Sequence, residues 1–308
     1  MPPGTYLQEL NRRLSDSLSR LSDEPRERHA VYLRNQQNSD GGFSGREGGS
    51  DLYYTGFALR SLVVLDGLTI DVSDRAAGFL RQSLTQQASV VDFFSLLYAA
   101  LLIQLNGGPD IFASSPPDWP ERVAATLETF RTPDGGYAKT PGSHAGSTYH
   151  TFLVCLTYQL LNKTLPRSDE VVRFVQSRQR EDGGYVEIGP MRRSGTNPTA
   201  AAVGILQILD ALHSTEAVIG FLAGMPSIEG GFRANNRAPL ADLLSTFTGL
   251  WTLHQLQALP RADLAAVRQY AESLELPGGG FRGGSWDMEK DVEYTFYGLG
   301  VLGLLTGP

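Results

Sequence analysis

Cysteine is almost absent from this chain, which has Cys155 as its single copy among 308 residues. One cysteine excludes an intramolecular disulfide, which fits a reducing compartment. Because Cys155 lies in the apolar run Phe152-Leu-Val-Cys-Leu156, we predict that it is a small residue of the core. The N-terminus lacks the basic-then-apolar order of a signal peptide, and no apolar run approaches the roughly 18 residues of a membrane span. The sequence therefore favours a cytoplasmic protein.

Positive charge is also in short supply. Lys and Arg number 26 against 33 Asp and Glu, which gives a net charge of −7 and a pI near 5.3. A chain with this balance offers no basic face for a nucleic acid backbone, so we expect no nucleic acid partner. Its 41% hydrophobic content is enough for a large core.

Two adjacent glycines followed by an aromatic residue recur along the chain. The first glycines of these pairs are Gly41, Gly135, Gly183, Gly230 and Gly279, and the last four are spaced by 48, 47 and 49 residues. The interval from Gly41 to Gly135 is 94 residues, which is twice 47. A sixth unit that has lost its glycine pair must therefore lie between these two glycines, and residues 91–105 supply the helix of that unit. A fixed period of this size marks a repeat architecture.

Every unit has the same order of elements. A helix with a polar face runs into the glycines, a loop follows, and a nearly uncharged helix begins near a threonine or, in the degenerate unit, near Ser95. A helix that is apolar all round is buried on all sides. We therefore predict an all-α fold, an α/α toroid (α6-α6 barrel) with two concentric rings of six helices joined by Gly-Gly-aromatic turns.

The toroid accounts for the whole chain as one domain, residues 1–308, with repeats from about residue 27 to 305. Residues 6–22 precede the repeats and read as an amphipathic helix, with leucines at three- and four-residue steps. This helix, within residues 1–26, caps the end of the array or docks on a partner.

The residues one and four positions before each threonine are expected to face the mouth of a central cavity. Four positions before lie Asp51, Asp242 and Asp291, and one position before lie His150 and Tyr294. Of these, Asp242, Asp291 and Tyr294 are the candidate catalytic residues. Three carboxylates at one repeat position form a ring at the mouth, or each caps the helix that follows it and compensates its dipole. His150 is either a ligand-facing residue or a satisfied structural histidine.

Two segments carry the Gln-x-x-x-Gly-x-aromatic pattern, Gln37 to Phe43 and Gln179 to Tyr185. The pattern resembles the repeats of squalene-hopene cyclases and of protein prenyltransferase β-subunits. The segment from Pro141 to Tyr149 and the segment that begins at Asp291 are most similar to geranylgeranyltransferase type II β-subunits. This resemblance implies an isoprenoid diphosphate as ligand, an aromatic barrel for its chain, a zinc ion that activates a thiolate acceptor, and an α-subunit as possible partner.

The zinc ligands of that family are an Asp and a Cys, spaced Asp-x-Cys, and a His in the last repeat. In one register they fall on Asp242, Leu244 and Tyr294 of this chain. In the other register they fall on three residues that are equally unsuited, Gly195, Asn197 and Ser245. Neither set can hold zinc, so we predict that zinc-dependent thiol alkylation is impaired or absent and assign no metal ligands.

Four basic residues are the candidates for binding a diphosphate. His144 matches the rim histidine of the family, Arg192 and Arg193 lie in the loop where the family has an Arg and a Lys, and Arg237 takes that place in the other register. Guanidinium groups there would clamp a diphosphate bidentately. The alternative for His144 is an ordinary surface histidine.

Aromatic side chains in or beside the apolar helices either line a hydrophobic pocket or fill the core. We expect Tyr54, Phe94, Trp251 and Tyr297 to contact the substrate, together with His150. Tyr53 and Phe93 are further members of this aromatic set.

Three functions fit these observations. The first is a prenyltransferase-like protein that binds an isoprenoid diphosphate. The second is a terpenoid cyclase; because neither Asp-x-Asp-Asp nor Asp-Asp-x-x-Asp occurs, its acid would be an unconventional one such as Asp242 or Asp291. The third is a non-catalytic module that binds isoprenoids or serves as a scaffold.

Overall fold

A computed structural model of the chain describes residues 4–84 and 89–306. Residues 1–3, 85–88 and 307–308, which the predicted single domain also included, lie outside the described residues. The elements in chain order are α1 Tyr6–Leu18, α2 Asp23–Asn35, α3 Leu52–Val64, α4 Ile70–Gln82, α5 Val90–Leu105, α6 Trp119–Glu128, α7 Thr148–Leu160, α8 Ser168–Ser177, α9 Thr196–Ile208, α10 Glu216–Ala223, α11 Leu243–Gln255, the 3-10 turn η1 Leu259–Arg261, α12 Leu264–Leu274, β1 Phe281–Arg282, β2 Lys290–Asp291 and α13 Val292–Leu305.

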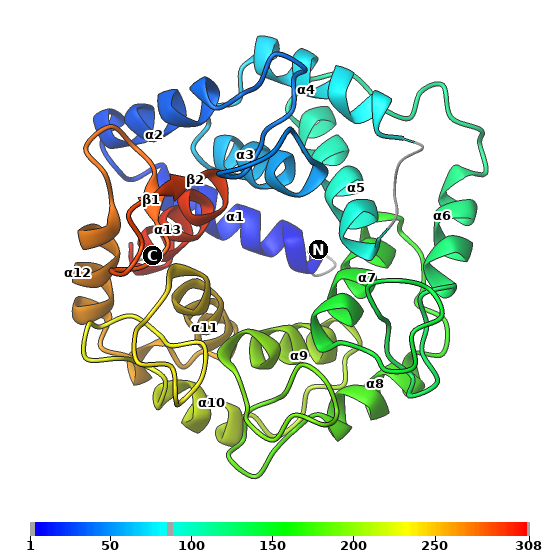
Figure 1. The fold of residues 1–308 in the computed structure, drawn as a ribbon, viewed down its shortest axis with the longest axis vertical. Coiled ribbons are helices and arrows are strands. Elements are labelled where there is room, and N and C mark those ends of the chain that lie inside the picture. The colour runs from blue at the N-terminus through cyan, green and yellow to red at the C-terminus, as the bar shows by residue number, and fades with distance from the viewer. Residues whose placement is uncertain (1–3, 85–88, 307–308) are drawn as a thin grey trace.

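Helices form two concentric rings (Figure 1). The inner ring consists of α3, α5, α7, α9, α11 and α13; each packs on the next, and α13 packs on α3 to close the circle. The outer ring consists of α2, α4, α6, α8, α10 and α12. This arrangement confirms the predicted α/α toroid, and α4 and α5 form the unit that has lost its glycine pair.

The inner helices pack closely because small residues face aromatic rings across their contacts. A Cβ atom on Gly204 of α9 would lie 2.5 Å from the ring of Phe152 on α7, and one on Gly300 of α13 would lie 2.4 Å from Phe247 on α11. Cys155 of α7 is buried, as predicted, and burial raises the pKa of its thiol to about 12. The inner ring is thus an apolar wall with few gaps between its helices.

The Gly-Gly turns hold each unit against the outer helix of the next. Gly183 has a φ of 86°, and a Cβ atom there would lie 2.2 Å from the carbonyl oxygen of Ala217 on α10. The same contact recurs from Gly41 to Arg75, Gly135 to Glu170, Gly230 to Ala266 and Gly279 to Arg28. Only a residue without a side chain permits this approach.

The repeat threonine lies within the first turn of its inner helix. Each inner helix begins three residues before its threonine where a threonine is present, so the threonine is not the N-cap residue. Its hydroxyl instead accepts the backbone N–H of the aromatic residue in the turn; for Thr199 and Tyr185 the nitrogen–oxygen distance is 2.9 Å. The hydroxyl of Thr199 also donates to the carbonyl of Gly195 at 2.7 Å. The threonine therefore fastens the turn to the inner helix.

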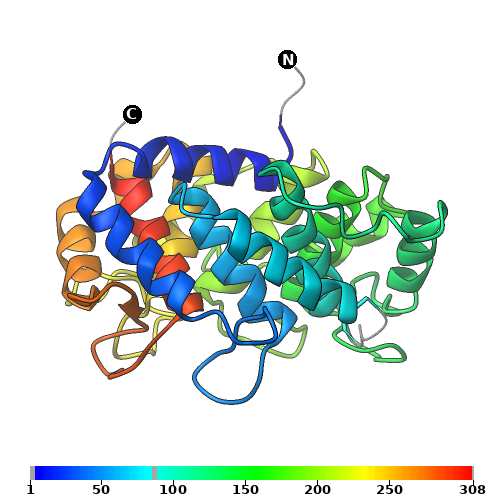
Figure 2. The same ribbon diagram turned by 90° about the horizontal axis from the view of Figure 1, so that it is seen from above.

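Helix α1 lies across one end of the inner ring, on the side away from the Gly-Gly loops (Figures 1 and 2). It packs on α13 and α3. Its leucines face inward, and Leu14 and Leu18 are fully buried, close to Gly303 at the end of α13. The helix therefore covers apolar surface at this end of the toroid.

The first and last units meet at a seam that is rich in polar contacts. The backbone N–H of Gly280 donates to Nδ1 of the buried His29 at 3.0 Å, and Nε2 of His29 lies 3.1 Å from Glu275 Oε1. Arg28 also pairs with Glu275. These contacts join α2 to the end of α12 and so complete the ring.

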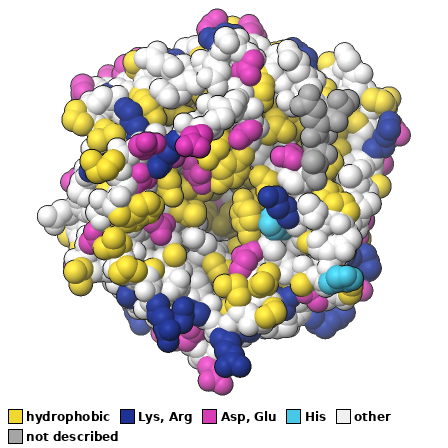
Figure 3. Space-filling model, viewed as in Figure 1, with side chains coloured by type: hydrophobic (Ala, Val, Ile, Leu, Met, Phe, Trp, Pro, Cys, Tyr) yellow, Lys and Arg dark blue, Asp and Glu magenta, His cyan; other side chains and the backbone are white. Residues whose placement is uncertain are grey.

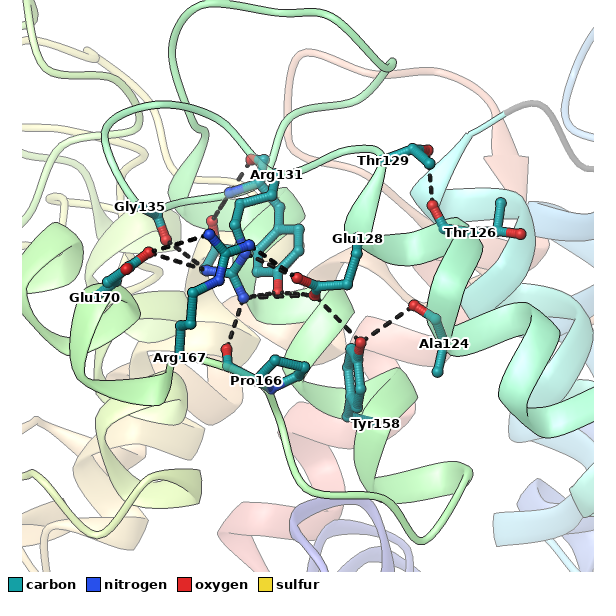
Figure 4. A network of polar contacts seen from close by, with 12 residues as sticks. Ala124, Thr126, Glu128, Thr129, Arg131, Gly135, Tyr158, Pro166, Arg167 and Glu170 are labelled. Atoms are coloured by element: carbon teal, nitrogen blue, oxygen red, sulfur yellow. Dashed lines mark hydrogen bonds and ion pairs between the residues drawn. The ribbon is translucent and has the colours of Figure 1, made fainter.

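A second polar network fastens the third unit to the fourth (Figure 4). The carboxylate of Glu128 accepts from Arg131 Nε at 3.0 Å, from the Tyr158 hydroxyl at 3.2 Å and from Arg167 at 3.1 Å. The Tyr137 hydroxyl donates to the same carboxylate at 2.6 Å. Glu128 ends α6, Tyr158 lies on α7 and Arg167 directly precedes α8, so the network joins both helices of the third unit to the start of the fourth.

Among the described helices, none combines the length and the apolar character needed to cross a bilayer.

Replacing Gly183 with alanine should destabilise the fold more than the same change at Gly142, which is the matched control. Both glycines have positive φ, 86° and 76°, but only Gly183 faces a neighbouring backbone, whereas a Cβ atom on Gly142 would meet nothing within 4 Å. We expect a loss of about 3 kcal/mol for Gly183→Ala and about 1 kcal/mol for Gly142→Ala. Urea unfolding measures both; equal losses would mean that the close approach contributes nothing.

Candidate functional site

A cavity of about 600 Å³ occupies the centre of the inner ring. In the space-filling view it is a hollow with hydrophobic side chains at its base and charged side chains around it (Figure 3). Its wall is mostly aromatic and aliphatic, with few charged groups. The lining residues are Tyr6, Leu7, Leu10, Tyr53, Gly56, Phe57, Arg60, Val91, Phe94, Ser95, Tyr98, Lys139, Tyr149, His150, Phe152, Leu153, Leu156, Glu187, Asn197, Ala200, Ala201, Leu244, Phe247, Thr248, Trp251 and Tyr297.

Helix α1 supplies the floor of the cavity through Tyr6, Leu7 and Leu10. The hydroxyl of Tyr6 accepts from Trp251 Nε1 at 2.8 Å and donates to Gln255 at 3.3 Å. The floor is therefore closed by apolar side chains whose polar atoms are already hydrogen-bonded.

Four of the predicted substrate-binding residues line this cavity: Phe94, His150, Trp251 and Tyr297. They come from α5, α7, α11 and α13, which are far apart in the sequence. The closed ring brings them together.

The repeat position that faces the cavity lies two residues before the threonine. Tyr53, Tyr149, Asn197 and Leu244 hold this position in four units and line the cavity. The expected positions were one and four residues before the threonine. Of the residues one position before, His150 lines the cavity, as does Phe94, which precedes Ser95 in the degenerate unit. One residue along a helix is a rotation of about 100°, which turns a side chain from the cavity toward a neighbouring loop.

Tyr54 and Tyr294 hold the expected position but do not line the cavity. A Cβ atom on Gly45 would lie 2.5 Å from the ring of Tyr54, and one on Gly283 would lie 2.8 Å from the ring of Tyr294. Both tyrosines thus pack against their own units' loops, and Arg46 lies over the ring of Tyr294 at 5.6 Å.

The predicted catalytic carboxylates Asp242 and Asp291 cap helices and do not line the cavity. Asp242 Oδ1 accepts from the backbone N–H of Ser245 at 2.7 Å, and Asp291 Oδ1 accepts from that of Tyr294 at 2.8 Å. Burial raises the pKa of both carboxyl groups, although these hydrogen bonds oppose the shift. Asp291 also pairs with Arg46 at 2.9 Å. Their contacts are those of the capping alternative.

The four basic residues predicted to bind a diphosphate lie in exposed loops outside the cavity lining: His144, Arg192, Arg193 and Arg237. Lys139 instead reaches the cavity from the loop before α7. No carboxylate oxygen within the described residues lies within 4.0 Å of its ammonium. Sequence reasoning missed Lys139 because its place, two residues after the turn aromatic Tyr137, is not one of the repeat positions expected to face the cavity.

Glu293 is a further functional candidate that sequence reasoning missed. Its Oε1 accepts from the hydroxyl of Tyr53 at 2.6 Å and from that of Tyr297 at 3.3 Å, and both rings line the cavity. Burial raises the pKa of this carboxyl group; the two tyrosine hydrogen bonds oppose the shift and Asp291 adds to it. Glu293 lies two residues before Thr295, at the repeat position whose residues line the cavity in four other units. That position is the sequence signal by which Glu293 could have been found.

His150 belongs to a hydrogen-bonded chain at the mouth. Its Nδ1 lies 2.8 Å from the hydroxyl of Ser147, which donates to the carboxylate of Glu187. Because Ser147 has one hydroxyl hydrogen and gives it to Glu187, it accepts from Nδ1–H of His150, which leaves the lone pair on Nε2. Burial, with the charge of Lys139, lowers the pKa of His150 to about 4. The imidazole is therefore a neutral base at pH 7.

Zinc does not fit the residues at the family positions. Leu244 has no ligand atom, and both carboxylate oxygens of Asp242 accept hydrogen bonds from Ser245. Across residues 4–84 and 89–306, no group of three or more His, Cys, Asp and Glu side chains could hold a metal ion.

The sequence model of the prenyltransferase alpha-alpha toroid domain matches residues 10–97 and 82–307. No curated protein matches the chain.

Several solved structures share the fold at low sequence identity. The protein geranylgeranyltransferase-I of Candida albicans, complexed with GGPP, superposes with a TM-score of 0.71 at 13% identity, over 91% of this chain and 90% of that one. The type II terpene cyclase MstE from Scytonema, in complex with geranylgeranyl dihydroxybenzoate, superposes with a TM-score of 0.59 at 12% identity, over 97% of this chain and 98% of that one. An alpha-1,6-mannanase from Salegentibacter sp. HEL1_6 superposes with a TM-score of 0.59 at 13% identity, over 91% of this chain and 98% of that one. At these identities the likeness concerns the fold alone.

The carboxyl group of Glu293 should titrate above 4.5, the ordinary value for glutamate. Replacing Tyr53 with phenylalanine removes a hydrogen bond to the carboxylate form, so it should raise the midpoint further. Carbon-13 NMR of labelled glutamate, assigned with a Glu293→Gln variant, gives the midpoint. Glu121, whose pKa is lowered by its hydrogen bond to Lys163, serves as an internal comparison below 4.5. A Glu293 midpoint at or below 4.5 would contradict the assignment.

Proposed function

This chain belongs to the prenyltransferase alpha-alpha toroid domain family, and we propose that it binds an isoprenoid diphosphate in its central cavity. The observation that carries the proposal is the cavity of about 600 Å³ with aromatic walls, open at the end where the Gly-Gly loops lie. That volume lies within the roughly 300–1,000 Å³ typical of small-molecule sites. A long apolar chain would replace water against the rings of Phe57, Phe94 and Phe247.

The diphosphate would remain at the mouth, where Lys139 lies without a carboxylate partner among the described residues. An ammonium contributes a charge-assisted hydrogen bond to a phosphate oxygen. His144 and the Arg192-Arg193 pair lie in exposed loops and would contact the head group only at its outer side. The binding of GGPP by the geranylgeranyltransferase-I and of a geranylgeranyl substrate by MstE supports this ligand class.

We assign no zinc-dependent step. The family positions hold Asp242, Leu244 and Tyr294, which do not form a zinc set. The acceptor that a prenyltransferase would alkylate, and an α-subunit that would present it, stay expectations from the family resemblance.

Titration calorimetry with geranylgeranyl diphosphate and farnesyl diphosphate tests the proposal. We expect micromolar binding that needs neither zinc nor magnesium, and a loss of about tenfold in Lys139→Met from the missing charge-assisted hydrogen bond. The matched comparison is the double variant Arg192→Met with Arg193→Met, which should lose less. A larger loss in the double variant would place the head group at that loop, and no binding of either diphosphate would favour a scaffold module.

Terpenoid cyclisation is a second candidate, favoured by Glu293. A carboxyl group with a raised pKa, hydrogen-bonded to Tyr53 and Tyr297 on the cavity wall, is placed to act as a general acid. Its proton would pass to an alkene carbon of the bound chain, and the π electrons of further alkenes would close rings. The resulting cation would lose a proton to a base, for which His150 is neutral and lines the same cavity.

Mass spectrometry of the products tests this second function. Incubation with geranylgeranyl diphosphate without added metal should give a cyclised isomer of unchanged mass, and Glu293→Gln should reduce its formation by at least 100-fold. The comparison variant is Asp291→Asn, which changes a capping carboxylate two residues away. If Asp291→Asn abolishes the product and Glu293→Gln does not, the acid is Asp291; the absence of any isomer rules out cyclisation of this substrate.

A further inference from the structure

A charged group that neither proposal uses lies among the aromatic rings of the cavity. Arg60 on α3 lines the cavity, and its guanidinium carbon lies 4.0 Å from the ring centre of Phe296, 5.1 Å from that of Phe57 and 5.3 Å from that of Tyr98. Its Nε is buried and has no hydrogen-bond partner. A guanidinium group is a permanent cation in proteins.

Arg60 also lacks a counter-ion. Within the part of the chain that the structure describes, no Asp or Glu oxygen comes within 4.0 Å of its guanidinium nitrogens. Three other shielded arginines are paired with carboxylates: Arg46 with Asp287 and Asp291, Arg131 with Glu128, and Arg178 with Asp134. Arg13 and Arg282 donate to backbone carbonyl oxygens instead.

An unpaired cation in an apolar enclosure is unfavourable unless something replaces its lost hydration. The faces of Phe296, Phe57 and Tyr98 do so in part through cation–π attraction. The hydroxyl of Tyr98 is a further partner of the guanidinium, but the buried Nε–H is left without an acceptor, because aromatic rings accept hydrogen bonds poorly. An anion that enters the cavity would supply both the charge and the acceptors.

We propose that Arg60 binds the carboxylate of an apolar carboxylic acid, whose chain fills the rest of the cavity. A carboxylate matches the planar fork of a guanidinium with two parallel hydrogen bonds. A diphosphate carries more negative charge than this single cation can balance, and the floor residues Leu7, Leu10 and Trp251 add none. The acid is thus a second ligand class, and its binding does not depend on the diphosphate binding proposed above.

The depth of Arg60 sets the orientation of such a ligand. Arg60 follows Tyr53 by two helical turns of α3, roughly 10 Å farther from the mouth. With its carboxylate at Arg60, the acid would extend its chain toward Tyr53 and Tyr297, where Glu293 lies. A bound carboxylate would also neutralise a charge that would otherwise repel a carbocation formed higher in the cavity. The acid is therefore a suitable substrate for the cyclisation described above.

Three probes with the same chain separate charge from apolar binding: geranylgeranoic acid, its methyl ester and geranylgeraniol. We expect the wild-type protein to bind the acid about 30-fold more tightly than the ester, measured by calorimetry at pH 7.5. Arg60→Met keeps the length of the side chain without its charge, and should lose that preference while binding geranylgeraniol within threefold of wild type. Arg60→Lys should retain part of it.

The ester comparison uses only the wild-type protein, so it holds even where an Arg60 variant fails to fold. Equal affinities for acid and ester, or an equal loss of acid and alcohol binding in Arg60→Met, would overturn the proposal and leave Arg60 a residue that shapes the cavity. Geranylgeranyl diphosphate is titrated in parallel. Acid binding without diphosphate binding would contradict the proposed function alone, and the reverse result would contradict this inference alone.

Discussion

The toroid depends on the contact between the first glycine of each turn and the backbone of the next outer helix. At Gly41, Gly183 and Gly230 that approach leaves no room for a side chain. The aromatic residue after the glycines is buried and holds the repeat threonine through its backbone N–H. One short turn thus connects three helices: the outer helix that leads into it, the inner helix that follows and the outer helix of the next unit.

The same contact also closes the ring. Gly279, in the last turn, lies against the backbone of Arg28 in α2. The sixth unit therefore packs on the first in the same way as each earlier unit packs on the next. Closure removes the exposed ends that an open array of repeats would have on its sides. What remains is the pair of openings along the axis, and α1 covers one of them. The cavity is a consequence of this arrangement, since a ring of inner helices encloses space that only α1 and the inward side chains can fill.

The apolar wall of the cavity controls the chemistry of the few polar groups in it. Burial disfavours charge on either kind of group, so it raises the pKa of the Glu293 carboxyl and lowers that of the His150 imidazole. The cavity is therefore lined by a base that tends to stay neutral, and Tyr53 and Tyr297 of its wall are hydrogen-bonded to an acid that tends to keep its proton. Arg60 differs from both, because a guanidinium group is a permanent cation in proteins and attracts an anion.

Sequence reasoning located the cavity wall better than the reactive groups. Phe94, Trp251 and Tyr297 lie in helices that are apolar all round, and any inward-facing aromatic of such a helix has a good chance of reaching a central cavity. The choice of Tyr54 and Tyr294 depended on the register of the helix start, which was misplaced by one residue. The neighbouring positions, Tyr53 and Glu293, were the ones that belong to the site.

The basic residues in the loops show a second limit of prediction from the sequence. Arg192 and Arg193 were selected because the family has basic residues in that loop, yet a loop's path is set by its contacts and not by a period. Lys139 reaches the cavity from a different loop, at a place that is not one of the repeat positions expected to face the cavity.

From the sequence alone, the repeat period, the alternation of polar and apolar helices and the glycine pairs determined the toroid, because each of these depends on local pattern and recurs in every unit. Only the tertiary structure decided which face of each inner helix meets the cavity, because that face follows from packing between units. Closure of the ring brought Arg60 of the first unit against Phe296 of the last and Tyr53 against Glu293. Those pairs are separated by more than two hundred residues and have no signature in the sequence.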